Sequence, residues 1–208
     1  PEIRHLIGTY QEMVGEGLNV SLVMAGLPGA VSTTLNDKVL TFLNRARKVS
    51  LPPLEQGEVD AFFKRSFDSL GIAIESGLRR SASAYTAGSP YLLQLVGHYT
   101  CLYAEDGKVS EESLAEALRT SGDDFQSDVC ATTLAALSER DVDFLEAMAE
   151  LGEPTSVAAV AEAMGATADY AQKYRRRLID GGVIKSAGRG KVAFDVPFLA
   201  EHLRRRNE

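Results

Sequence analysis

The run KYRRR concentrates basic side chains in a chain that is otherwise acidic. Seven basic residues and one acidic residue, Asp180, lie between positions 173 and 191. The seven are Lys173, Arg175, Arg176, Arg177, Lys185, Arg189 and Lys191. Lys and Arg at this density bind phosphates, because each neutralised phosphate of DNA releases condensed counterions. The sequence predicts a DNA contact at these seven residues; the alternative is a basic face that is solvated, paired internally or docked on another protein.

The stretch VMAGLPGAVSTT, residues 23–34, has the glycines of a phosphate-binding loop but not its lysine. A P-loop reads G-x-x-x-x-G-K-[ST], because backbone amides cradle the phosphates while the lysine reaches the terminal ones. Counting from Gly26 places Val31 and Ser32 at the Gly-Lys positions, and counting from Gly29 fails in the same way. No predicted strand ends in paired acidic residues for magnesium. This sequence alone is therefore not expected to bind ATP and Mg²⁺ or to act as an enzyme.

The rest of the composition excludes several other functions. The three histidines share no ligand spacing, and Cys101 and Cys130 have no Cys or His cluster around them, so no metal site is expected. Lys and Arg number 11 against 17 Asp and Glu before Ser138, and 11 against 12 from Ser138 on, so any basic surface must be local. No apolar run approaches the roughly 18–20 residues of a membrane span, and the first residues do not resemble a signal peptide. The sequence predicts a cytoplasmic protein without membrane contact.

The basic run falls on the third of three helices that the sequence predicts after residue 137. Ser138 begins the first with a capping-box pattern, the second covers residues 156–164, and the third runs from about 167 to 180. Two short strands, 183–186 and 191–196, flank the turn AGRG. Three helices followed by a hairpin are the order of a winged helix-turn-helix.

The third helix has one face that the sequence assigns to the interior. Tyr170, Tyr174 and Leu178 recur at helical spacing and are expected to pack inward. This turns Lys173 and Arg176 toward solvent, as a recognition helix in a DNA major groove requires.

The chain before residue 138 reads as two further segments. The first 54 residues are predicted as helix, strand, helix, strand, with the helices at about 3–14 and 35–43 and the strands at 20–25 and 47–51. Residues 55–137 are predicted as about four helices, one of them with Ser110 as its N-cap. The predicted fold class is therefore mostly α (α+β).

Four segments in order resemble the C-terminal half of an AAA+ ATPase: VSLVMAGLPGA, LNRARKVSLPPL, TAGSPYLLQLVGHY and the winged helix. The chain is similar to bacterial and archaeal ATPases of this class that carry a terminal winged helix and are related to origin-recognition proteins. The resemblance covers essentially the whole chain. It implies three domains: residues 1–54, the C-terminal remnant of the nucleotide-binding domain; residues 55–137, a helical lid; and residues 138–208, the winged-helix domain.

The resemblance also implies roles in nucleotide binding. Sensor 1 falls near Ala25 and Gly26, and the motif LNRARKV supplies an arginine finger at Arg45, with Arg47 as the runner-up. An arginine finger stabilises charge that develops on a transferred phosphate across a subunit boundary; the alternative is that both arginines are solvated charges. The segment GSPYLL matches the sensor 2 motif, where many relatives have arginine after proline, but this sequence has Tyr91 there and so lacks the charge for a lid contact to the γ-phosphate.

Together these features predict a fragment of an AAA+-type ATPase in which a nucleotide-responsive lid is coupled to a DNA-binding winged helix. ATP and Mg²⁺ would bind the full-length parent, whose hydrolysis the sequence leaves open, and no cofactor is expected on this chain. Two alternatives stay open: a winged helix that binds protein in a regulatory or signalling ATPase, and a stand-alone winged-helix transcription factor. The partners are accordingly double-stranded DNA, a second copy of the chain or another protein.

Overall fold

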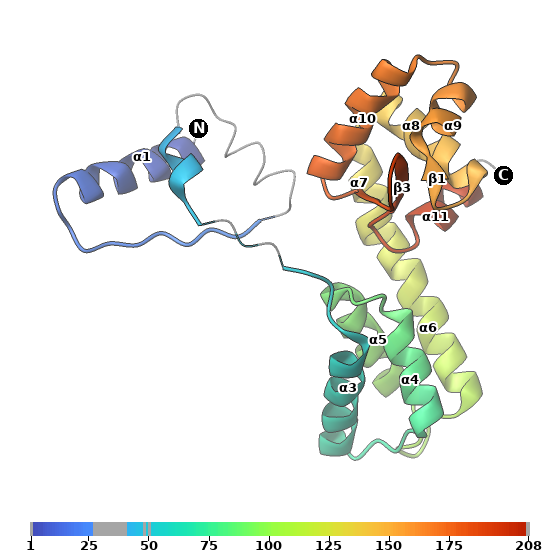
Figure 1. Cartoon of the computed structure of the whole chain (residues 1–208). Coiled ribbons are helices and arrows are strands. Elements are labelled where there is room, and N and C mark those ends of the chain that lie inside the picture. The colour runs from blue at the N-terminus through green and yellow to red at the C-terminus, as the bar shows by residue number, and fades with distance from the viewer. Residues whose placement is uncertain (1, 27–40, 48, 50, 207–208) are drawn as a thin grey trace.

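A computed structural model describes residues 2–26, 41–47, 49 and 51–206 (Figure 1). Helices make up most of this part of the chain, and its strands form a three-stranded antiparallel sheet. The predicted fold class, mostly α with a small β component, is confirmed. No helix within these ranges is long and apolar enough to cross a bilayer.

The first segment contains α1 (Glu2–Gly15) and a 3-10 helix, η1 (Thr41–Arg45). They meet at Ile7 and Leu43, which are buried together. The strand predicted at residues 20–25 is wrong: this run forms no strand, and Val23 is 93% exposed. A strand is stable only where a neighbouring strand pairs with its amides and carbonyls, and the described residues provide no partner strand here.

The second predicted strand, 47–51, also differs from the structure where the structure describes it. Residues 47, 49 and 51 belong to no strand, and the other two positions lie outside the described residues. Most of the helix predicted at 35–43 lies outside them as well. Its last positions are described and belong to η1.

The middle of the chain is a helical bundle, a name used here for residues 56–125. Its helices are α3 (Gln56–Leu70), α4 (Ser76–Tyr85), α5 (Pro90–Leu102) and α6 (Glu111–Phe125). Phe63 and Phe67 of α3 are both 1% exposed and stack at 5.4 Å, whereas the neighbouring Phe62 is 43% exposed. Arg79 of α4 holds α3 through Asp60, with Nε 2.9 Å from Oδ1, and this hydrogen bond lowers the pKa of the Asp60 carboxyl.

Capping side chains fix where the later helices of the bundle begin. Ser89 accepts a hydrogen bond from the amide of Leu92, and Pro90 occupies the first turn of α5, where its missing amide is not needed. Ser110 and Ser113 form a reciprocal capping box at the start of α6, as predicted for Ser110.

Helix α6 continues beyond the bundle. It passes into a π-helical segment, η2 (Gln126–Cys130), and then into α7 (Ala131–Ala135), and the residues at both joins keep right-handed helical angles. One long helix therefore leads from the bundle to the last part of the chain (Figure 1).

The last part, called here the C-terminal module, covers residues 138–206. Its helices are α8 (Glu139–Leu151), α9 (Val157–Ala163), α10 (Ala168–Asp180) and α11 (Leu199–Arg206). Its strands are β1 (Thr155–Ser156), β2 (Ile184–Ser186) and β3 (Lys191–Phe194), in the order β1-β3-β2. The β2–β3 hairpin was predicted, with Ile184 opposite Phe194, whereas β1 was not.

Two large hydrophobic clusters hold these parts together. One lies inside the helical bundle around Phe63, Phe67 and Val96. The other fills the C-terminal module around Phe144 and Met148, and it also includes Leu92 and Phe125 of the bundle. The core therefore runs across residue 137 without a break, and the predicted domain boundaries stay predictions.

Candidate nucleic-acid interface

Helix α10 packs against the rest of the C-terminal module through one narrow face. Thr167 caps it by accepting a hydrogen bond from the amide of Tyr170, 3.3 Å away. The buried residues are Ala171, Tyr174 and Leu178. Tyr170 was expected inside but is 39% exposed, and its hydroxyl oxygen accepts a hydrogen bond from the hydroxyl of Tyr174. Ala171 therefore takes the buried position that Tyr170 was expected to fill. Its small side chain allows α10 to approach its neighbours closely.

Arg177, predicted to contact DNA, is held by an internal ion pair. Its Nη2 lies 2.5 Å from Oδ1 of Asp141, whose side chain is only 3% exposed. Nη2 also donates to Oγ of Ser138 at 2.9 Å, and the guanidinium lies over the ring of Tyr174, 4.9 Å from its centre. Arg177 therefore fixes α10 against the start of α8, and we call Ser138, Asp141 and Arg177 the α8–α10 clamp.

Asp141 has two structural tasks at once. Its Oδ2 accepts from the backbone amide and from the hydroxyl of Ser138, which completes the predicted capping box of α8. Its Oδ1 accepts from Arg177. A buried carboxylate needs such partners, because an unpaired one carries a large desolvation cost. The sequence signalled the cap but not the ion pair with a residue 36 positions away.

Two more of the seven residues predicted to contact DNA are partly buried or paired with an acidic residue. Arg175 is half-buried, and its Nε is enclosed without a hydrogen-bond partner among the described residues. Lys185 lies on β2, and its Nζ is 3.3 Å from Oδ1 of Asp195. This ion pair is exposed, and exposed ion pairs contribute little to stability.

The other four basic residues are exposed and have no ion-pair partner in the part of the chain that the structure describes. They are Lys173, Arg176, Arg189 and Lys191. Arg189 occupies the turn of the hairpin, between Gly188 and Gly190, whose φ angles are 107° and 71°. Left-handed backbone of this kind suits glycine, so the turn can present Arg189 at its tip.

The outward face of α10 also carries acidic side chains. Asp169 and Asp180 lie on the same side of the helix as Lys173 and Arg176, opposite the buried face, and all four are exposed. The positive charge is therefore confined to the middle turns of α10 and to the hairpin.

The three arginines of α11 all have internal partners. Arg204 donates to the carbonyl oxygen of Ala149 at 2.9 Å, and Arg206 lies 2.6 Å from Glu146. Arg205 lies 3.7 Å from Asp123 of α6. These contacts fasten α11 within the protein rather than presenting it to a phosphate.

The structure does not bring the predicted nucleotide-binding residues together. Ala25 and Gly26 are exposed in a segment without regular structure, and Arg45 and Arg47 are exposed in and just after η1. Figure 1 shows this first segment apart from α5, on which Tyr91 lies. The described residues therefore do not form a site that fits ATP and Mg²⁺.

Tyr91 itself has a protein partner. Its hydroxyl donates to Oδ2 of Asp128 in η2 at 2.6 Å, and this hydrogen bond raises the pKa of Tyr91. The residue that the sequence resemblance placed at the sensor 2 position therefore connects α5 with the π-helical segment in this protein.

Comparisons with known proteins indicate the fold and one partial family match. A family model described as a domain of unknown function (DUF8462) matches residues 127–203. No curated protein matches the chain. Among solved structures, the Walker-type ATPase PABY2304 of Pyrococcus abyssi is similar with a TM-score of 0.63 and 16% identity, over 85% of this chain and 50% of that one. The RuvB Holliday junction branch migration motor of Thermotoga maritima aligns with a TM-score of 0.33 and 20% identity, over 74% of this chain and 50% of that one.

The likeness to the Walker-type ATPase concerns the fold. The chain spans about half the length of the solved structures that it matches. It has the fold of part of a Walker-type ATPase, as the resemblance to AAA+ ATPases implied in its general form.

Proposed function

We propose that the C-terminal module is a winged helix that binds double-stranded DNA and that the helical bundle is the lid of an AAA+-type ATPase. The succession of α8, α9 and α10 followed by the β2–β3 hairpin supports the winged helix. One observation carries the DNA-binding part: four exposed basic side chains have no ion-pair partner among the described residues. They are Lys173, Arg176, Arg189 and Lys191.

In this proposal α10 enters the major groove and the hairpin lies on the adjacent backbone. Lys173 and Arg176 belong to the middle turns of α10, while Arg189 and Lys191 belong to the hairpin. Each of the four neutralises a phosphate and releases a counterion. Arg177 holds α10 in place for this contact and does not count among the four.

The ATPase part of the proposal concerns the whole protein. ATP and Mg²⁺ would be held by a P-loop that this chain does not contain. Arg45 is the candidate arginine finger, because it ends η1 with its side chain exposed, as a contact to a neighbouring subunit requires. The protein would work in the cytoplasm.

A salt titration tests the DNA-binding proposal. We expect the affinity of the 208-residue chain for a 30-base-pair duplex, measured by fluorescence anisotropy, to fall with a log–log slope of about −3.6, from four phosphates at about −0.9 each. The variant Lys173→Gln/Arg176→Gln should reduce the slope by about 1.8. The control Lys64→Gln/Arg65→Gln removes two exposed basic residues from α3 and should leave it unchanged. The absence of binding at low salt, or equal effects of the two variants, would contradict the proposal.

A second candidate function is favoured by the acidic residues of α10. Asp169 and Asp180 flank Lys173 and Arg176 on the outward face, and a mixed-charge face suits a protein partner as well as DNA. The C-terminal module would then be an interaction module of a regulatory ATPase. A protein partner that is captured by the wild-type chain and lost with Lys173→Glu/Arg176→Glu, in a chain that does not bind the duplex at low salt, would favour this function.

A further inference from the structure

Three elements meet where the helical bundle joins the C-terminal module. Tyr85 is the last residue of α4, Gly122 lies in the final turn of α6, and Phe198 directly precedes α11. The rings of Tyr85 and Phe198 are 5.1 Å apart, and the rings of Phe198 and Phe125 are 6.0 Å apart in an edge-to-face arrangement. Such aromatic pairs contribute beyond the apolar area that they bury.

Gly122 makes room for the Tyr85 hydroxyl. A β-carbon at position 122 would lie far inside van der Waals distance of the hydroxyl oxygen, but 3.6 Å from Cζ, an ordinary contact distance. Gly122 is in a regular helix and is buried. Glycine is unfavourable in a helix interior, so its presence here reflects the space that the hydroxyl takes.

Tyr85 has little freedom to move away. It packs against both large hydrophobic clusters, the one inside the bundle and the one of the C-terminal module. Burial raises the pKa of its hydroxyl, as expected for an enclosed group. A displacement of the Tyr85 ring would therefore press on Phe198.

Phe198 is itself in an unfavourable backbone conformation. Its φ is 59°, in the left-handed region that a bulky residue rarely adopts. Such a conformation persists only where surrounding contacts impose it. The ring contacts with Tyr85 and Phe125, and the bond from the thiol of Cys130 to the carbonyl oxygen of Pro197 at 3.5 Å, supply those contacts.

We propose that Tyr85, Gly122 and Phe198 form a latch that couples the helical bundle to the C-terminal module. The Tyr85 hydroxyl sits on the backbone of α6 at Gly122, and the Tyr85 ring supports Phe198 at the start of α11. A shift of α4 relative to α6 is thereby transmitted to α11. The latch concerns the fold of this chain and does not depend on DNA or ATP binding.

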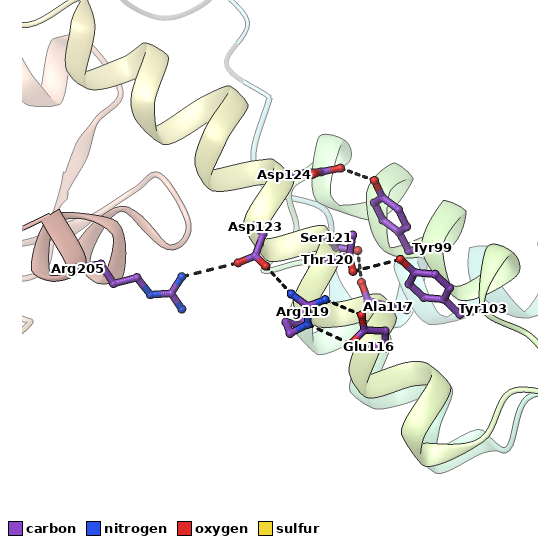
Figure 2. A network of polar contacts seen from close by, with 10 residues as sticks. All are labelled: Tyr99, Tyr103, Glu116, Ala117, Arg119, Thr120, Ser121, Asp123, Asp124 and Arg205. Carbon is purple, nitrogen blue, oxygen red and sulfur yellow. Dashed lines mark hydrogen bonds and ion pairs between the residues drawn. The ribbon is translucent and has the colours of Figure 1, made fainter.

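The polar contacts next to the latch lie on the surface and reinforce it weakly. Figure 2 shows Asp123, one residue after Gly122, between Arg205 of α11 and Arg119 of α6. All three side chains are about half exposed or more, so these pairs are screened by water. The coupling therefore rests on the aromatic contacts and on the missing side chain at position 122.

The test compares two glycine-to-alanine variants in the full chain. Gly122→Ala should lower the Tm by about 2–10 °C, because overpacking displaces Tyr85. It should also speed hydrogen exchange of the amides in η2 and α11 more than of those in α3. Gly57→Ala is the matched control: it also lies in a helix, has no atom within 4 Å of the new methyl group, and should leave Tm equal or higher.

A rescue variant separates the latch from general damage. Tyr85→Phe removes only the hydroxyl, so that Gly122→Ala/Tyr85→Phe can place its methyl group against Cζ at an ordinary distance. We expect the double variant to regain the Tm and the slow exchange of Tyr85→Phe alone, even if Gly122→Ala by itself fails to fold. If Gly122→Ala behaves like Gly57→Ala, or if Tyr85→Phe does not rescue it, the latch is refuted.

Discussion

At the scale of single residues, the role of a basic side chain in α10 depends on whether it reaches a buried acidic partner. Arg177 and Arg176 are neighbours, and both are exposed. Arg177 reaches the buried carboxylate of Asp141, whereas Arg176 has no ion pair among the described residues. A buried carboxylate holds its partner more firmly than a surface one, because water does not compete for it. The two arginines should therefore behave differently in the same experiments.

Arg177→Gln should destabilise the protein without changing how it responds to salt. The substitution takes one charged partner from the buried carboxylate of Asp141, which costs about 1–3 kcal/mol, toward the lower end because the guanidinium is half exposed. Urea unfolding measures this loss. In the DNA titration, Arg177→Gln should keep the wild-type slope, because Arg177 neutralises no phosphate. Arg176→Gln is the control and should show the reverse pattern: full stability and a slope smaller by about 0.9.

The sequence did not show which of the seven basic residues lack an ion-pair partner among the described residues. Helical periodicity correctly places Lys173 and Arg176 outward. It also predicts Tyr170 inside, and the choice between Tyr170 and Ala171 depends on how closely α10 approaches the other helices. The partner of Arg177 is Asp141, on another helix, and single-sequence patterns contain no signal for such a contact.

At the scale of elements, two helices begin with the same capping motif in different surroundings. At the start of α6, Ser110 and Ser113 bond each other's backbone and side chains on the surface, without a partner from another helix among these bonds. At the start of α8, the Ser138 hydroxyl donates to Asp141 and accepts from Arg177 of α10. The second cap is thus part of the α8–α10 clamp as well as of its own helix.

Replacing the two caps should therefore have unequal effects. Ser110→Ala should cost about 1 kcal/mol, the usual value for a lost N-cap. Ser138→Ala should cost about 2 kcal/mol, because it removes the cap and two hydrogen bonds to charged groups of the clamp. The measurement is the free energy of unfolding in urea for both variants. Equal losses would mean that the contact with Arg177 contributes nothing.

Elements that depend on local sequence were predictable, and elements that depend on pairing were not. Capping at Ser110 and Ser138 and the hairpin around Gly188 and Gly190 all follow from short-range rules. The prediction of a strand at residues 20–25 was wrong because an apolar run forms a strand only beside a neighbouring strand. Strand β1 was missed because two residues carry no periodicity and pair with β3 some 36 positions later.

At the scale of the whole molecule, the first segment has an apolar surface that the described residues do not cover. Ile3 and Leu6 of α1 are 57% and 55% exposed, and Val14 is 48% exposed. An amphipathic helix normally buries such a face, because exposed apolar area costs free energy in water. Packing of this face on a sheet, as in the nucleotide-binding domain of an ATPase, would remove the cost. The proposal that this chain is part of an AAA+-type ATPase predicts that arrangement.

The ATPase part of the proposal therefore makes a prediction about the gene. The reading frame that encodes this chain should also encode G-x-x-x-x-G-K-[ST] within roughly 150 residues before residue 1, a typical domain length. The longer protein should bind ATP in an equilibrium assay and lose binding when that lysine becomes alanine, because the lysine reaches the terminal phosphates. In the longer protein, α1 amides should also exchange more slowly than in the 208-residue chain, since the new sheet covers Ile3 and Leu6. A reading frame without this motif would leave the DNA-binding proposal in place and remove the ATPase from it.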